Sequence, residues 1–316
     1  MSESSSCPPA PLKGSTKRPP LGEFLPPIVS LPSSSLHTST IIFLHGRGSN
    51  AKKFAEPLLS TPVTGHLTFR DALPHTKFIF PTAPLMRATK YRRSIIHQWY
   101  DGTGDWEPEV RGNMRQSVEY IHGILQREIQ LLRNSKSVVL AGISQGCAMS
   151  LTSMLLWNGS PLGAVIGICG FMPLNDHLTE ILDGRHYNET GEDDDIVFGS
   201  ESESDGDVGK DKNNTPTPLQ MAVAELREEV ELPHTLQLPL SFLSTPIFIG
   251  HGTEDSNVEY YHGQRAAELL AKMGLPVELH TYDGLGHWYS QEMLGHILVF
   301  LSDKADFKNT RVVDDG

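Results

Sequence analysis

Cysteine is scarce in this sequence, with 3 residues in a chain of 316. Cys7, Cys147 and Cys169 provide neither a disulfide framework nor a C-x-x-C pair, which excludes a small disulfide-stapled fold. Cys147 and Cys169 lie among apolar residues, where a free cysteine behaves as a small hydrophobic side chain. We therefore expect reduced, buried thiols and a cytoplasmic protein.

Long apolar runs are also missing. No segment approaches the roughly 18 consecutive apolar residues that a transmembrane helix needs. The N-terminal residues lack the apolar core of a signal peptide. We expect no integral membrane segment.

An excess of basic charge is absent as well, because the net charge at pH 7 is −12. Residues 189–211 hold ten acids and one lysine, a net of −9, which leaves only −3 for the rest of the chain. A nearly neutral folded part argues against a protein that binds nucleic acid.

Composition divides the chain into a tail, one domain and a second tail. Residues 1–22 are rich in serine and proline and are expected to form a disordered tail. Residues 23–304 are expected to form one domain. Within it, residues 186–240 are expected to be an acidic, largely disordered insertion, because they have too few apolar residues for a core of their own. Residues 305–316 form a C-terminal tail.

Short apolar runs alternate with segments of helical spacing, which indicates a mostly parallel central sheet with helices on both faces, an α/β fold. A short edge strand is expected within 24–36. Residues 84–112 contain Trp99 and several glycines and are expected to be a long irregular loop of functional importance. The other strands are expected at 40–44, 77–80, 138–141, 163–169, 246–250 and 277–281, and the helices at 113–133, 147–156, 219–231, 259–273 and 289–302.

Gly142-Ile-Ser-Gln-Gly146 carries most of the functional information. The pentapeptide G-x-S-x-G is weak evidence alone, but here it joins the strand 138–141 to the helix 147–156. Strand, tight turn and helix together are the context of a nucleophile elbow, which exposes its serine above the sheet. Ser144 is therefore the candidate nucleophile.

A serine nucleophile needs a base and an acid that orients the base, in the chain order Ser, Asp or Glu, His. Strand 246–250 leads into Glu254 and Asp255, and strand 277–281 leads into Asp283 and His287. We assign Asp255 as the orienting acid and His287 as the general base. Glu254 and Asp283 are the alternative acids, and Asp283 is disfavoured because it is so close to His287 along the chain.

Acyl transfer also requires hydrogen-bond donors for the oxyanion of the tetrahedral intermediate. The backbone N–H of Gln145, at the start of the helix after the elbow, is one candidate. The loop His45-Gly-Arg-Gly48 follows the first long strand, and we nominate the backbone N–H of Arg47 as the second donor. His45 is interpreted as a structural residue that shapes this loop.

Four motifs resemble those of the acyl-protein thioesterase, lysophospholipase and carboxylesterase family of α/β hydrolases. They are Phe43-Leu-His-Gly-Arg-Gly48, Gly142-Ile-Ser-Gln-Gly146, His251-Gly-Thr-Glu-Asp255 and Gly284-Leu-Gly-His287-Trp-Tyr-Ser-Gln-Glu-Met293. Trp99-Tyr-Asp101 resembles that family's Trp-Phe-Asp, and Trp99 is a candidate substrate-binding residue. The resemblance spans 24–183 and 244–302. It implies an α/β-hydrolase fold without a lid, and no metal or cofactor.

The chain departs from this pattern at three places. Cys147 stands where the family often has a second glycine after the elbow, Ser49 stands where an aspartate is usual, and the segment 186–240 is foreign to compact members. These departures leave the catalytic assignment in place and weaken the inference to palmitoylated proteins.

The sequence therefore predicts a serine hydrolase that cleaves carboxylic esters or thioesters through an acyl-enzyme. An acyl-protein thioesterase or a carboxylesterase is preferred, with lipidated proteins among the candidate substrates. A lysophospholipase-type esterase, a prolyl-type peptidase and a non-catalytic binding protein on a hydrolase fold are the alternatives.

Overall fold

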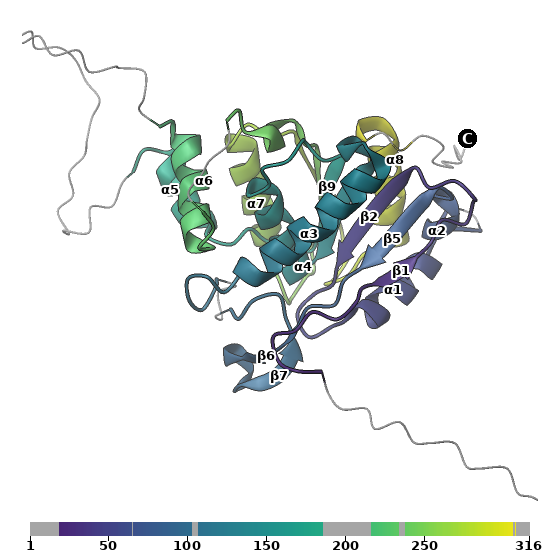
Figure 1. Ribbon diagram of the computed structural model, residues 1–316, viewed down its shortest axis with the longest axis horizontal. Helices are drawn as coiled ribbons and strands as arrows, with labels where there is room; N and C mark the ends of the chain where they lie inside the picture. The colour runs from purple at the N-terminus through teal and green to yellow at the C-terminus, as the bar shows by residue number, and fades with distance from the viewer. Residues whose placement is uncertain are drawn as a thin grey trace, which may run out of the picture.

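A computed structural model describes residues 19–64, 66–102, 107–185, 216–233, 238–305 and 307. Its centre is a seven-stranded sheet in the order β1-β5-β2-β8-β9-β10-β11 (Figure 1). The strands are β1 (Ile28–Ser30), β2 (Ser39–Leu44), β5 (Thr76–Phe80), β8 (Val138–Ile143), β9 (Ala164–Ile168), β10 (Ile247–Gly252) and β11 (Val277–Tyr282). Only the edge strand β1 is antiparallel to its neighbour, so the predicted mostly parallel sheet is confirmed.

Helices cover both faces of this sheet. The longer ones are α1 (Ala51–Ser60), α3 (Arg115–Leu132), α4 (Gln145–Leu155), α5 (Asn175–Leu182), α6 (Pro218–Glu229), α7 (Tyr260–Lys272) and α8 (Gln291–Lys304), and α2 (Phe69–Ala72) is a single turn. Short 3-10 helices lie at Thr89–Tyr91, Ser135–Ser137 and Ser241–Ser244. Among the described residues, no helix has both the length and the apolar character needed to cross a membrane.

The sheet separates two apolar clusters. Ile42 and Leu44 of β2 point into the first cluster, together with residues of α3, α4, α6 and α7. Ile41 and Phe43, the alternate residues of the same strand, point into the second cluster with residues of α1, α2 and α8. Because both faces are covered, the central strands can be apolar at every position, and all six residues of β8 are buried.

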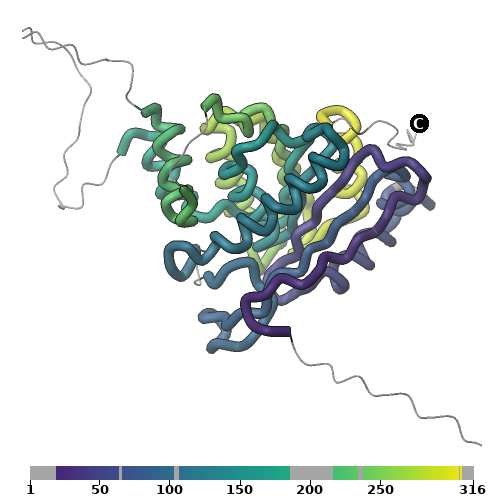
Figure 2. The backbone as a smooth tube through the Cα atoms, viewed as in Figure 1, coloured from purple at the N-terminus to yellow at the C-terminus, as the bar shows by residue number. Residues whose placement is uncertain are grey.

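The region 84–112 is more regular than the sequence suggests. It contains a hairpin of β6 (Leu85–Ala88) and β7 (Ser94–His97), whose turn includes Arg92 and Arg93 at φ 52° and 61°. The expectation that residues 84–112 form an irregular loop is therefore wrong for the hairpin. Hairpin strands pair through backbone hydrogen bonds and need no strong apolar pattern in the sequence. In Figure 2 the described N-terminal residues run from this hairpin along the outer edge of the sheet, and Leu21 pairs with Leu85.

A second short hairpin, the single turn α2 and the two longer helices α1 and α5 were not predicted. The hairpin consists of β3 (Pro62–Thr64) and β4 (Leu67–Thr68). Helix α1 is ten residues long and contains Pro57, and α5 is eight residues long, so neither shows an extended helical pattern.

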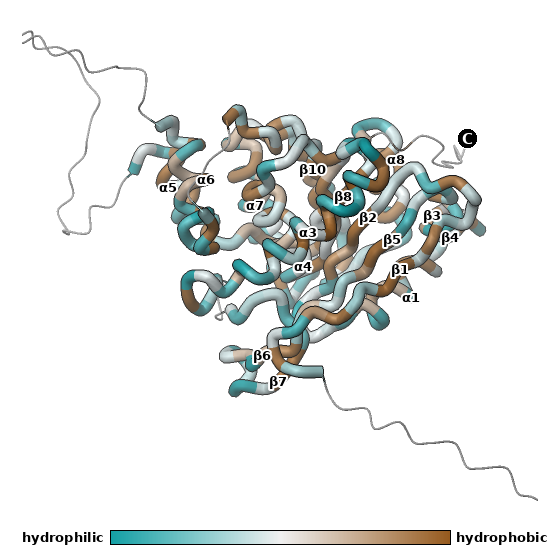
Figure 3. Tube along the Cα trace, viewed as in Figure 1, coloured by the Kyte–Doolittle hydropathy of each residue, from teal (hydrophilic) through white to brown (hydrophobic). Residues whose placement is uncertain are grey.

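Helix α6 lies within the segment 186–240 and matches the helix predicted at 219–231. Thr217 and Gln220 form a capping box at its start, with Pro218 in the first turn. Val223 and Leu226 are each 1% exposed and belong to the first apolar cluster. Hydrophilic and hydrophobic residues alternate along this helix in Figure 3, as its one-sided packing requires. The acidic run 189–211 lies outside the described residues, as do most of the two tails.

We predict that α6 stabilises the whole domain. Leu226→Ala should lower the free energy of unfolding by about 2–5 kcal/mol, because it removes a buried side chain and leaves a cavity. Leu131→Ala is the matched control, since Leu131 on α3 is 61% exposed and its loss should cost less than about 1 kcal/mol. Urea denaturation of both variants measures the difference. Equal effects would show that α6 contributes nothing to the stability of the core.

Candidate active site

Ser144 lies on a strained turn between β8 and α4. Its backbone adopts φ 58° and ψ −126°, a conformation that costs a non-glycine residue free energy. A Cβ atom on Gly142 would lie 2.2 Å from the carbonyl oxygen of Gly146, and one on Gly146 would lie 2.3 Å from that of Leu44. Both positions therefore require glycine, and the turn has the geometry of a nucleophile elbow.

Asp255 follows β10 and is held rigidly. Its Oδ1 accepts hydrogen bonds from the backbone N–H groups of Asn257 and Val258, both at 2.9 Å. Its side chain is fully buried. These two hydrogen bonds fix the orientation of the carboxylate and leave Oδ2 for another partner. Glu254 and Asp283, the alternative acids, are exposed.

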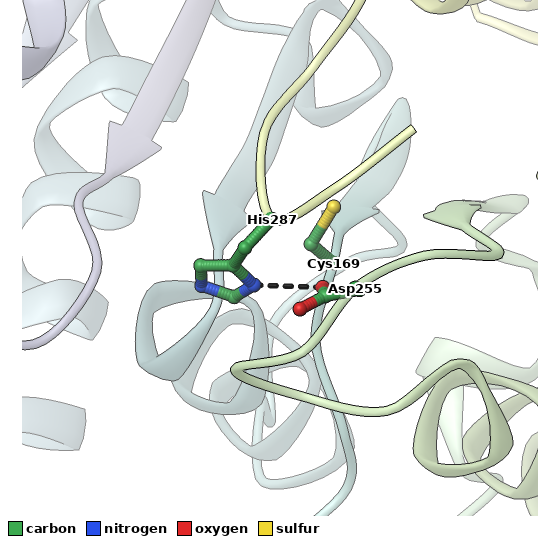
Figure 4. A group of neighbouring side chains, drawn as sticks. All are labelled: Cys169, Asp255 and His287. Atoms are coloured by element: carbon green, nitrogen blue, oxygen red, sulfur yellow. Dashed lines mark hydrogen bonds and ion pairs between the residues drawn. The ribbon is translucent and has the colours of Figure 1, made fainter. Parts of the chain in front are cut away.

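His287 follows β11 and pairs with Asp255. Its Nδ1 lies 2.7 Å from Asp255 Oδ2 (Figure 4). The carboxylate can only accept, so Nδ1 carries the proton and Nε2 of a neutral ring has a free lone pair. The His287 side chain is 18% exposed. The ring is thus oriented by a buried acid while remaining accessible, which is what a general base requires.

His251 is a third group at this acid that the sequence analysis did not assign. Its Nε2 donates to the carbonyl oxygen of Val258 at 2.9 Å and lies 3.3 Å from Asp255 Oδ2. Burial lowers the pKa of His251, so the ring stays neutral at physiological pH. Its position as the fifth residue of β10, four before Asp255, was the signal that could have identified it.

The described residues contain one cluster whose donor types could bind a cation. Cys169 Sγ, a carboxylate oxygen of Asp255 and a ring nitrogen of His287 lie within 4.8 Å of one another. Both oxygens of Asp255 already accept hydrogen bonds, Oδ1 from Asn257 and Val258 and Oδ2 from His287. The Cys169 thiol in turn contacts the carbonyl of Trp288. The arrangement therefore fits a hydrogen-bonded acid and base better than a cation site.

The loop of residues 45–48, called the oxyanion loop from here on, lies against the nucleophile. A Cβ atom on Gly46 would lie 3.1 Å from the Cβ atom of Ser144, so Arg47 belongs to a turn directly beside the elbow. The N–H of Gly48 donates to the carbonyl of His97 at 2.7 Å, which anchors this turn to β7. Gln145 begins α4, and the first N–H groups of a helix have no partner within it. The structure thus brings both candidate donors close to Ser144.

The side chain of His45 holds the oxyanion loop through two hydrogen bonds. Its Nδ1 donates to the carbonyl of Gly46 at 2.8 Å, and its Nε2 accepts the N–H of Ala83 at 3.0 Å. Burial lowers the pKa of His45 to about 4, so this neutral tautomer persists at physiological pH. The expected structural role of His45 agrees with these contacts.

Trp99 is buried and hydrogen-bonded to the oxyanion loop. It is 1% exposed, and its indole N–H donates to the carbonyl of His45 at 2.7 Å. The side chain of Gln145 accepts the N–H of Trp99 at 3.0 Å and donates to the carbonyl of Tyr100 at 2.9 Å. Sequence reasoning considered only the backbone of Gln145 and nominated Trp99 for substrate binding. In the structure the Trp99 indole holds the oxyanion loop, and the Gln145 side chain holds the backbone of Trp99 and Tyr100. Trp99 therefore has almost no surface to offer a substrate.

Comparison with known proteins agrees with this architecture. The sequence pattern of the phospholipase/carboxylesterase family matches residues 28–190 and 230–304. An acyl-protein thioesterase 1 from Gibberella zeae is 25% identical over 285 residues, which cover 88% of this chain and 95% of that protein. Carboxylesterase SOBER1 from Arabidopsis thaliana is 23% identical over 266 residues, which cover 81% of this chain and 86% of that protein.

Solved structures show the same fold. Arabidopsis thaliana SOBER1 superposes with a TM-score of 0.58 at 22% identity, covering 84% of this chain and 98% of its own. Zea mays acyl-protein thioesterase 2 gives a TM-score of 0.56 at 20% identity, covering 87% and 97%. The family pattern covers more than half of the chain, so the resemblance seen in the motifs is confirmed. The chain belongs to the phospholipase/carboxylesterase family of α/β hydrolases, a family of ester and thioester hydrolases.

Proposed function

We propose that this protein hydrolyses carboxylic thioesters and esters through a Ser144–His287–Asp255 triad. The observation that carries the proposal is the 2.7 Å hydrogen bond between His287 Nδ1 and Asp255 Oδ2. It joins two loops that leave β10 and β11 at the same edge of the sheet as the Ser144 elbow. A base oriented by a buried acid beside a strained serine is the arrangement that acyl transfer needs.

The proposed reaction has two halves. Ser144 Oγ attacks the acyl carbonyl while His287 Nε2 takes the hydroxyl proton, and the N–H groups of Arg47 and Gln145 stabilise the oxyanion. The intermediate collapses to an acyl-enzyme, and His287 returns the proton to the departing thiol or alcohol. A water then attacks the acyl-enzyme with His287 again as base, which releases the carboxylic acid and restores Ser144.

The substrate class follows from the relatives and from the surface near the site. Relatives are named acyl-protein thioesterases and carboxylesterases, which supports acylated proteins and acyl esters as substrates. A cavity of about 510 Å³ lies beside the loop after β9, and Phe171, Met172 and Leu174 line it together with polar and charged residues such as Asp176 and Arg265. Phe171 also packs on Ala148 and Val258, next to the elbow and the acid. This cavity could receive part of an acyl substrate.

A cytoplasmic location and lipidated protein partners belong to the same proposal. The two described cysteines, Cys147 and Cys169, are buried free thiols, which suits a reducing compartment. We expect turnover of a palmitoylated peptide and of p-nitrophenyl esters, with lower kcat/KM for a lysophospholipid and for acyl-CoA. A preference for the lysophospholipid would favour the alternative esterase. The absence of turnover in the whole panel would favour a non-catalytic binding protein.

Removal of the proposed nucleophile is the direct test. Ser144→Ala should abolish covalent labelling by a fluorophosphonate probe and lower kcat at least about 10⁴-fold, because no acyl-enzyme can form. Ser153→Ala on the same helix is the control. The Ser153 hydroxyl is buried without a hydrogen-bond partner, so its removal should leave labelling unchanged. Labelling of Ser144→Ala at the rate of the wild type would refute the assignment.

The free energy of unfolding should decrease in acid because of His45, the histidine that holds the oxyanion loop. The pKa of His45 is about 4 in the folded protein against about 6.5 when unfolded, so the unfolded state binds more protons between these values. Stability from this group is complete above pH 6.5 and falls as the pH drops, by about 3 kcal/mol at pH 4. His45→Gln removes this contribution. The stability difference between wild type and variant should therefore shrink from pH 7 to pH 4.

Urea denaturation of both proteins across this range measures the difference. His37, His122 and His251 also have lowered pKa values and are present in both proteins, so their effects cancel in the comparison. A difference that stayed constant with pH would contradict the neutral role assigned to His45.

A further inference from the structure

Cys169 sits at the end of β9 in a conformation that aims its side chain at the catalytic loops. Its backbone N–H continues the pairing of β9 with β10 by donating to Gly250 at 2.9 Å. Its φ of 46° lies in the left-handed region, which a residue with a Cβ atom seldom adopts. The side chain is fully buried and lies beside Asp255 and His287 (Figure 4), with the three polar atoms within 4.8 Å of one another. Such strain persists only where surrounding contacts hold it.

The thiol contacts the carbonyl groups of the two residues next to His287 in the sequence. Cys169 Sγ lies 3.3 Å from the carbonyl oxygen of Trp288 and 3.9 Å from that of Gly286. The Trp288 N–H donates to the same Gly286 carbonyl at 2.8 Å, so a tight turn is centred on His287. A donor directly after β9 therefore holds the turn that carries the proposed base.

The charge state of the cluster suits this role. Burial and Asp255 keep the pKa of the Cys169 thiol at about 12, so it remains a neutral S–H donor at any working pH. A thiolate at this place would repel the Asp255 carboxylate. His251, the other titratable group facing Asp255 from β10, is also neutral because burial lowers its pKa. The Asp255 carboxylate is thus the charge that orients His287.

We propose that Cys169 is a positioning residue for His287, holding the 286–288 turn through its thiol so that Nδ1 faces Asp255. It touches no reacting atom and acts only through the base. This inference rests on the proposed function, because it assigns a role within the same triad.

Three variants separate this role from simple packing. Cys169→Ala removes the donor, and Cys169→Ser keeps a donor on a shorter side chain. Cys147→Ala is the control for loss of a buried thiol, because Cys147 is 1% exposed and its thiol packs against Gly167 and Gly170, whereas the thiol of Cys169 contacts the carbonyls of Gly286 and Trp288. Steady-state kinetics on a p-nitrophenyl ester should show kcat about 3- to 10-fold lower for Cys169→Ala with an unchanged KM. Cys169→Ser should recover most of this loss, and Cys147→Ala should match the wild type.

The pH profile supplies a readout that packing alone would not move. The acid limb of kcat/KM reports protonation of the base in the free enzyme. When the Asp255 contact loosens, the imidazolium loses part of its stabilisation, so the acid limb of Cys169→Ala should shift to lower pH by about half a unit or more. Wild-type kcat with an unshifted limb would overturn the proposal. A loss of kcat equal to that of Cys147→Ala, with no shift, would also overturn it.

Proton NMR makes the test independent of hydrolysis. The Nδ1–H of His287 bonded to Asp255 should give a downfield resonance that His287→Gln abolishes. It should move upfield or broaden in Cys169→Ala and persist in Cys169→Ser and Cys147→Ala. An unchanged resonance in Cys169→Ala would refute the positioning role even if hydrolysis were confirmed. A protein without activity on any ester would refute the proposed function, while this resonance would still report on Cys169.

Discussion

The close approach of helix α4 to the sheet is the constraint on which the site depends. Gly142 and Gly146 leave no room for a Cβ atom between the elbow and the carbonyls that face it. This contact forces Ser144 into a strained backbone conformation and directs the N-terminus of α4 toward the nucleophile. Because β8, β9, β10 and β11 are parallel, their carboxyl ends lie at one edge of the sheet, so Cys169, Asp255 and His287 converge there.

Neutral histidines and backbone carbonyls hold the loops around this edge. His45 and His251 are both fully buried, and each has at least one hydrogen bond to a backbone group. Burial lowers the pKa of both rings, so the loops are held by uncharged groups. The Asp255 carboxylate can then act on His287 without a competing buried cation beside it. Trp99 and the Gln145 side chain extend the same framework under the oxyanion loop.

Helix α6 lies outside the part of the chain that matches the family pattern, yet it packs on the core of the domain. The family match is interrupted between residues 190 and 230, and α6 lies in that interval. Arg227 is 4% exposed and donates to two carbonyls of Pro233 and Leu156, the second at the C-terminal end of α4. A guanidinium at a helix C-terminus is favourable because the last carbonyls of a helix lack partners. Helix α6 is therefore joined to the C-terminal end of α4, the helix that follows Ser144.

The sequence by itself determined the order of the seven strands of the central sheet, the elbow and the candidate triad, because buried strands, glycines and turn residues leave local signals. It also indicated the family through the motifs around Ser144, Asp255 and His287. Only the tertiary structure decided that His251 and Cys169 face the acid and that Trp99 lies under the loop. It also decided that residues 84–112 contain a hairpin and that α6 packs on the core. These features depend on contacts between residues far apart in the chain, and such contacts leave no periodic or local pattern to read.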